Sequence, residues 1–216
     1  MLASSAATRH GARAAYAAGV DTFYAQHGSH YHNPHEPLVR TLVMQVMEQL
    51  FVDNVEQQQQ PLAILDLAAG SGEVSRAVLA WHAMKLQQQQ HDDDKHKKTF
   101  PRLDLNAMDP FTAQAYETAV GRPCLDMSFA DIAAQGLPRQ YDVVICSFAL
   151  HLCPAPSLLY AVCVQLAMSS AKYLVILTPH KRPHITAAMG WTLQEEVVQQ
   201  KVRRRTYVNN GMFTGE

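Results

Sequence analysis

One stretch of this chain, residues 62–75, constrains the fold more than any other. It begins as an apolar run that is too short for a typical helix, and it ends in a Gly-x-Gly turn at Gly70 and Gly72. Apolar residues then recur at offsets of three and four, namely Val74, Ala77, Val78 and Trp81. A strand, a glycine turn and a helix form the first half of a βαβ unit, so the stretch predicts an α/β fold. Glycines at such a turn let the backbone approach a ligand closely, because no Cβ intervenes.

The charges around the turn narrow the choice of ligand. Asp66 ends the predicted strand and Glu73 opens the predicted helix. A dinucleotide fingerprint reads G-x-G-x-x-G, with the pyrophosphate at the helix N-terminus. Here Ser75 holds the place of the third glycine. Two carboxylates would repel a pyrophosphate, whereas they suit an ammonium or sulfonium group. The turn therefore disfavours a nicotinamide dehydrogenase.

The stretch resembles the first motif of class I S-adenosylmethionine-dependent methyltransferases, which runs D-x-A-x-G-x-G or close to it. Asp66, Ala68, Gly70 and Gly72 match this motif position by position. The resemblance implies S-adenosyl-L-methionine as cofactor and a Rossmann-like α/β/α sandwich of three layers. In such a fold the sheet is mostly parallel, with an antiparallel C-terminal strand. A plain strand-to-helix turn of another α/β protein stays open on this motif alone, since short motifs recur by chance.

A second strand candidate, residues 103–109, alternates in polarity and stops at Asp109, which Pro110 follows. Asp109 lies 37 positions after Gly72, or 25 when a low-complexity insertion at 87–98 is left out. In dinucleotide folds the equivalent acid follows the glycines by roughly 20 residues. The resemblance implies that Asp109 binds the ribose hydroxyls of the cofactor, with Pro110 beside it. The alternative is an acidic cap for a helix over residues 112–119.

Residues 124–129 form a third strand candidate, which Asp131 and Ile132 follow. In the resembled family an acid or amide after this strand often meets the adenine amino group, and a neighbouring backbone amide meets a ring nitrogen. We therefore expect Asp131 and Ile132 at the adenine. Capping of the following helix is the alternative for Asp131.

A nearly continuous apolar run, residues 141–147, is typical of a central parallel strand. It ends at Ser147, which the resemblance places at the cofactor site. His151 follows in the next loop, at the expected mouth of the site, and is our candidate general base; a substrate contact or a plain loop side chain stays open. Residues 147–150 read Ser-Phe-Ala-Leu. They differ from N-P-P-Y, the signature of amide or nucleobase amino methylation in the resembled family, which disfavours such a group as methyl acceptor.

The N-terminal part, residues 1–56, is predicted to be a helical segment that caps the site, ahead of a cofactor-binding domain at 57–216. A helix is expected after Pro37, and Tyr31 is the candidate aromatic over the cofactor by analogy with the family. A packed surface tyrosine is the alternative. The histidines of this part match no closed zinc site, so we predict no metal there: His27, His30, His32 and His35.

Length and composition set broader limits. With 216 residues, 48% of them hydrophobic, the chain can bury one core. A net charge of −1 gives no support for nucleic acid as a partner, and no apolar run reaches the roughly 20 residues that span a bilayer. The four cysteines include no C-x-x-C pair, which favours reduced thiols and a cytoplasmic protein. The alanine- and arginine-rich first 20 residues leave mitochondrial targeting open.

Together these features predict an enzyme that transfers a methyl group from S-adenosylmethionine to an acceptor. A small-molecule acceptor is favoured, with RNA or protein open. The alternative is a catalytically silent subunit that binds the cofactor and supports a partner protein.

Overall fold

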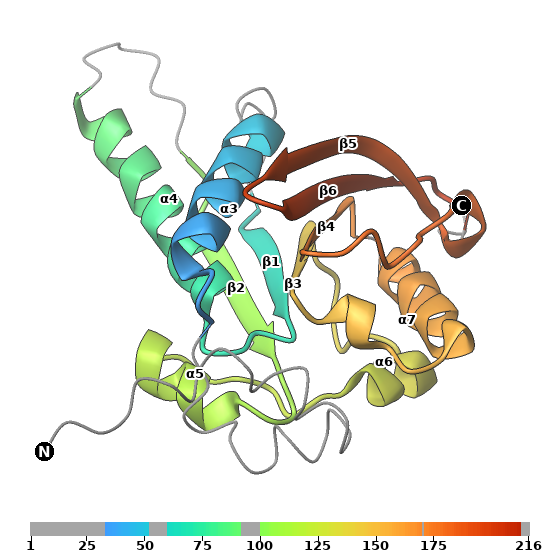
Figure 1. Cartoon of the computed structure of the whole chain (residues 1–216). Coiled ribbons are helices and arrows are strands. Elements are labelled where there is room, and N and C mark those ends of the chain that lie inside the picture. Colours follow the sequence, from blue (N-terminus) through green and yellow to red (C-terminus); the bar gives the residue numbers. More distant parts are fainter. Residues whose placement is uncertain (1–32, 52–59, 92–99, 170, 213–216) are drawn as a thin grey trace, which may run out of the picture.

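The computed structural model describes residues 33–51, 60–91, 100–169 and 171–212. In these residues, a six-stranded sheet forms the middle layer of the protein (Figure 1). The helices and strands are α3 Glu36–Phe51, β1 Leu62–Leu67, α4 Glu73–His91, β2 Leu103–Met108, α5 Ala113–Val120, α6 Phe129–Gln135, β3 Val143–Ser147, η4 Leu150–Leu152, α7 Pro156–Met168, β4 Tyr173–Thr178, η5 Ala187–Met189, β5 Trp191–Gln199 and β6 Val202–Asn209. The strand order is β2-β1-β3-β4-β6-β5.

Four neighbouring strands, β2, β1, β3 and β4, run parallel. Their carboxyl ends share one edge of the sheet. β1 lies between β2 and β3, where Leu65 is paired with Asn106 on one side and with Val144 on the other. All six residues of β1 are buried, because helices cover both faces of a parallel sheet. The structure thus confirms the strand predicted from residue 62 and the strand predicted within residues 141–147.

Helices α3 and α4 cover one face of the sheet, and α6 and α7 cover the other (Figure 1). Alternate residues of a strand therefore enter opposite cores. Ile64 packs with α3 and α4, whereas its neighbour Leu65 packs with α6 and α7. The predicted three-layer α/β/α sandwich is confirmed.

Helix α3 is part of the core of this sandwich. It begins at Glu36, one residue before Pro37 and close to the predicted start, and its apolar face packs on α4 and the sheet. Trp81 of α4 is fully buried, lies 5.6 Å from Phe51 between ring centroids, and donates its indole N–H to Glu48. The described part of the predicted N-terminal segment thus shares a core with the cofactor-binding domain, rather than lying only as a cap over a site.

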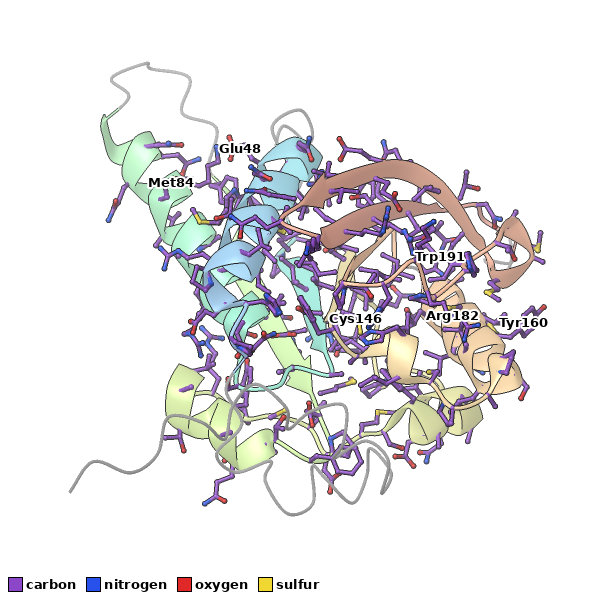
Figure 2. All side chains as sticks on the ribbon, viewed as in Figure 1. Glu48, Met84, Cys146, Tyr160, Arg182 and Trp191 are labelled. Atoms are coloured by element: carbon purple, nitrogen blue, oxygen red, sulfur yellow. The ribbon has the colours of Figure 1, made fainter. Side chains whose placement is uncertain are left out.

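The C-terminal strands β5 and β6 form an antiparallel hairpin, in agreement with the predicted antiparallel C-terminal strand. β6 pairs antiparallel with β4, and β5 pairs with β6. Trp191, labelled in Figure 2, lies at the start of β5. It is 1% exposed and donates its indole N–H to the carbonyl of Cys163 on α7, at 2.9 Å. This contact ties the hairpin to the helical layer.

Two elements differ from the sequence prediction. Residues 124–129 do not form a strand; Leu125 makes an isolated bridge with Met108, and Ser128 already caps α6. Helix α4 continues through residues 87–91, which we assigned to an insertion, because glutamine is a good helix former. In the described residues, no helix is long and apolar enough to cross a membrane.

Candidate functional site

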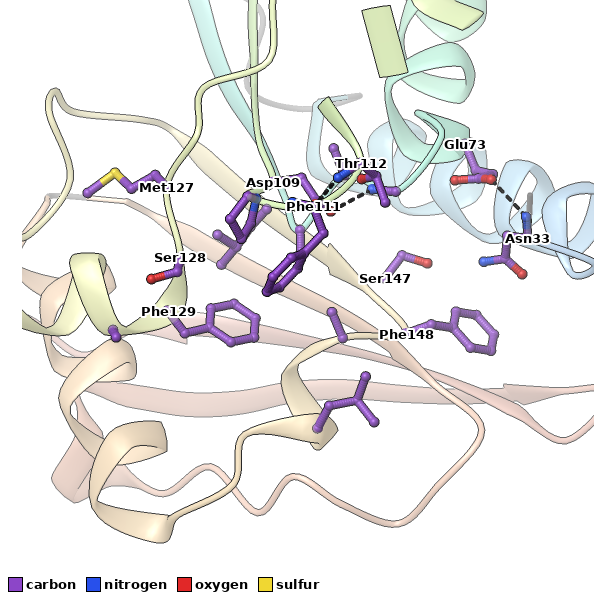
Figure 3. Close-up of a pocket in the computed structure, with 18 of the residues that line it drawn as sticks. Asn33, Glu73, Asp109, Phe111, Thr112, Met127, Ser128, Phe129, Ser147 and Phe148 are labelled. Atoms are coloured by element: carbon purple, nitrogen blue, oxygen red, sulfur yellow. Dashed lines mark hydrogen bonds between the residues drawn. The ribbon is translucent and has the colours of Figure 1, made fainter. Parts of the chain in front are cut away.

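A cavity of about 510 Å³ lies at the carboxyl ends of β1, β2 and β3 (Figure 3). Open α/β sheets bind ligands at this edge. Aromatic and aliphatic side chains make up much of its lining, with Phe111, Phe129 and Phe148 among them. Its polar side chains are Asn33, Glu73, Asp109, Thr112, Ser128 and Ser147. Among the described lining residues there is no lysine, arginine or histidine.

The glycine-rich turn after β1 forms one wall of the cavity. Ala68 and Gly70 line it, and both have positive φ angles, of 56° and 59°. Ala69, between them, donates its N–H to the carbonyl of Met108 at 3.1 Å, which joins the turn to the end of β2. The turn therefore presents backbone rather than large side chains to the cavity at Ala68 and Gly70, two of the residues predicted at the cofactor.

Asp66 does not line the cavity. It is buried beneath the turn, where its Oδ2 accepts from the N–H and the hydroxyl of Ser75, at 3.0 and 2.7 Å. Burial raises the pKa of the Asp66 carboxyl to about 8. This acid thus anchors the first turn of α4, and its raised pKa favours the protonated form over the negative charge that we predicted at this position.

Gly72 has a packing role. A Cβ at this position would lie 2.3 Å from a methyl carbon of Val120 and 3.1 Å from the ring of Tyr116, both on α5. Gly72 has a φ of 86° and is not among the lining residues. The glycine therefore lets α5 approach the turn, and the structure does not place it at the cavity, where the motif predicts it.

Asp109 lies at the cavity, at the end of β2, and its carboxylate connects the glycine-rich turn to the segment before α5. Its Oδ1 accepts from the N–H groups of Phe111 and Thr112, at 2.8 and 2.9 Å, and its Oδ2 accepts from the Gly70 N–H at 3.1 Å. A carboxylate offers about four lone-pair positions, so one remains for a ligand. Pro110, which we predicted beside Asp109 at the cofactor, also lines the cavity.

The segment after residue 126 lines the cavity with other residues than those we predicted. Met127, Ser128 and Phe129 are lining residues. Asp131 instead forms a capping box with Ser128, in which its carboxylate accepts from the Ser128 N–H at 2.8 Å. Ile132 is fully buried in the core, and its N–H donates to the Ser128 carbonyl. The capping alternative for Asp131 is what the structure shows.

The end of β3 brings Ser147 and Phe148 to the cavity. Ser147, which we predicted at the cofactor, lines the cavity, and its buried Oγ has no hydrogen-bond partner in the described part of the chain. Phe148 has a φ of 57°, which is rare for a bulky residue. Its ring is stacked on that of His35, with 5.1 Å between centroids. Strain of this kind at a cavity wall is a common mark of a functional site.

His151 lies in η4, between lining residues Ala149 and Leu152, but is not itself a lining residue. Its ring lies 4.8 Å from that of His180, between centroids. Burial, with a smaller effect of His180, lowers the pKa of His151 to about 4. Its buried Nδ1 has no partner among the described residues. His151 is therefore a neutral imidazole next to the cavity.

Asn33, Glu73 and Phe148 are among the cavity residues that were not predicted from the sequence as site residues. Glu73 is 4% exposed and accepts from the Ser71 hydroxyl at 2.5 Å and from the Asn33 N–H at 3.2 Å. The position of Glu73 directly after the Gly-x-Gly turn could have indicated a site residue. Nothing in the sequence indicates that Asn33 lies near that turn. Tyr31 lies outside the described residues. Those residues contain no group of three or more His, Cys, Asp or Glu that could hold a metal ion.

Comparisons with solved structures define the class of fold. Magnesium protoporphyrin IX methyltransferase from Synechocystis PCC 6803, solved with bound SAM, aligns with a TM-score of 0.55 and 15% identity over 91% of this chain and 94% of its own. The N-methyltransferase NodS from Bradyrhizobium japonicum, in complex with S-adenosylhomocysteine, aligns with a TM-score of 0.52 and 11% identity over 82% and 89%. The fold is that of the class I S-adenosylmethionine-dependent methyltransferases.

A sequence relative defines the family. An uncharacterized protein of Schizosaccharomyces pombe is 37% identical over 192 residues, which cover 82% of this chain and 77% of the relative. The chain belongs to the same protein family as this fission-yeast protein. No protein-family profile matches the chain.

Proposed function

We propose that this protein is an S-adenosylmethionine-dependent methyltransferase. The observation that carries the proposal is the cavity beside the glycine-rich turn, which is lined by two carboxylates and, in the described residues, by no cationic side chain. S-adenosylmethionine carries a sulfonium and an ammonium group, which suit such a lining. A pyrophosphate would meet the carboxylates of Glu73 and Asp109, which argues against a nicotinamide dinucleotide.

The lining residues suggest which part of the cofactor each would hold. Phe111, Met127 and Phe129 offer apolar contacts for the adenine ring. Asp109 keeps an acceptor position for a ribose hydroxyl, and the backbone at Ala68 and Gly70 would lie along the amino-acid end. The bound cofactor supplies a methyl group already activated by its positive sulfur, so the protein mainly has to align donor and acceptor.

The acceptor end of the cavity is expected to be near Ser147. The unpartnered hydroxyl of Ser147 can donate to or accept from an acceptor, and Leu152, Pro154 and Leu158 offer an apolar surface. This lining favours a small molecule as the methyl acceptor. His151, which is neutral above about pH 4, is the proposed base for an acceptor that must lose a proton. That role, and a cytoplasmic location, stay predictions.

Methyl transfer itself is the test of this function. The purified protein, given S-adenosylmethionine with a tritiated methyl group, is incubated with separate fractions of small metabolites, RNA and protein. We expect label to appear in the small-molecule fraction and to depend on native protein. Binding of the cofactor without transfer to any fraction would instead support a catalytically silent subunit.

A further inference from the structure

Glu73 is a buried acid whose charge the described structure does not balance. The side chain lines the cavity, and the residue is 4% exposed. None of the ion pairs in the described part of the chain includes it. A carboxylate this buried is costly unless a cation or hydrogen bonds compensate it. Its place in the first turn of α4 offsets part of this cost, because the helix dipole favours negative charge there.

The hydrogen bonds of Glu73 leave one of its oxygens available. Both the Ser71 hydroxyl and the Asn33 N–H donate to Oε1. Within the described residues, no donor contacts Oε2. Figure 3 shows Glu73 beside Asn33, away from Met127 and Ser128 at the other end of the cavity. An acceptor with free capacity is thus present at the end of the cavity opposite to the proposed adenine contacts.

We propose that Glu73 binds the α-ammonium group at the amino-acid end of the cofactor. This assignment rests on the proposed function. It differs from what the motif suggests, where Asp66 is the matching acid. Asp66 lies beneath the turn, bonds to Ser75 and does not line the cavity. Asp109 lies at the end of β2 and already accepts from three backbone N–H groups.

The assignment predicts a specific pattern of ligand affinities. S-adenosylhomocysteine carries both the ammonium and the carboxylate, decarboxylated S-adenosylmethionine keeps only the ammonium, and 5′-methylthioadenosine has neither. Glu73→Gln removes the charge but keeps an oxygen that can accept from Ser71 and Asn33. In calorimetric titrations we expect this variant to lose affinity for the two amine-bearing ligands by roughly ten- to hundredfold, as for a lost charge-assisted hydrogen bond. Its affinity for 5′-methylthioadenosine should match that of the wild type.

The control is Glu117→Gln, which makes the same change of charge on the exposed face of α5, outside the cavity. It should leave all three affinities unchanged. If Glu73→Gln does not fold by circular dichroism, Glu73→Asp replaces it, with the same selective loss expected. Wild-type affinity for S-adenosylhomocysteine in the variant, or an equal loss for all three ligands, would overturn the assignment. A wild-type protein that binds none of the three would overturn the proposed function and this assignment with it.

Discussion

Three acids lie around the glycine-rich turn, and their surroundings give them different tasks. Asp66 is buried against Ser75, with its pKa raised to about 8. Asp109 holds the turn and the start of α5 together through backbone N–H groups. Glu73 is buried, yet its side chain lines the cavity. The sequence alone shows three carboxylates near one turn, and it is their burial and hydrogen bonds that separate an anchor from a ligand-binding group.

Asp66 is expected to make the protein less stable as the pH rises. Burial raises its pKa from 3.8 to about 8. Between these two pH values, the folded state therefore keeps a proton that the unfolded chain has already lost. The contribution of this group to the free energy of unfolding is therefore fully present below about pH 4 and is lost as the pH rises through about 8. In urea unfolding at pH 6.5 and 8.5, Asp66→Asn should show a smaller decline than the wild type. Equal declines would mean that Asp66 is not the buried proton carrier.

Gly72 is expected to matter for packing. Alanine at this position would place its Cβ against Val120 at a φ of 86°, and we expect a loss of about 1–3 kcal/mol in the free energy of unfolding. Gly121 is a matched control, since it also has a positive φ, of 71°, but a Cβ there would meet nothing within 4 Å. Gly72→Ala should therefore cost more than Gly121→Ala, and adding Val120→Ala should restore part of the difference. Equal costs for the two alanine variants would exclude the clash.

At the scale of elements, the strands that the sequence predicts best are those buried on both faces. β1, β3 and β4 are continuous apolar runs, which a central parallel strand requires. Residues 124–129 were predicted as a strand, but Leu125 is 45% exposed and Ser128 already begins the cap of α6. The end of α4 was missed because glutamine gives no apolar periodicity while still favouring a helix.

Helix α3 leads to a prediction about where the folding unit begins. Eight of its residues are buried: Leu38, Val39, Leu42, Val43, Val46, Met47, Leu50 and Phe51. Burial of a large apolar side chain contributes about 1.5–3 kcal/mol, and the net stability of a domain is only about 5–15 kcal/mol. A chain restricted to residues 57–216 should therefore lack a cooperative thermal transition by circular dichroism, whereas the full chain shows one. A truncated chain that melts like the full one would restore the domain boundary at residue 57.

At the scale of the whole molecule, the cavity is assembled from segments that are far apart in the sequence. The turn after β1, Asp109 at the end of β2 and Ser147 at the end of β3 could be predicted, because parallel strands bring their carboxyl ends to one edge. Asn33 could not, since its N–H reaches Glu73 across 40 positions of the chain. The stacking of His35 on Phe148 is equally non-local. Local patterns thus identify the strand ends, and tertiary packing adds the remaining wall of the cavity.

The most direct test of the central claim is the equilibrium binding of S-adenosylhomocysteine and of NAD⁺ to the purified full chain by calorimetry. We expect one S-adenosylhomocysteine per chain and no heat from NAD⁺. In Asp109→Asn we expect affinity for S-adenosylhomocysteine to fall by roughly tenfold or more, because a charge-assisted hydrogen bond is lost. That variant should also melt earlier, since the same carboxylate holds Gly70, Phe111 and Thr112. An absence of S-adenosylhomocysteine binding in a folded wild-type protein, or binding of NAD⁺ with equal affinity, would contradict the account.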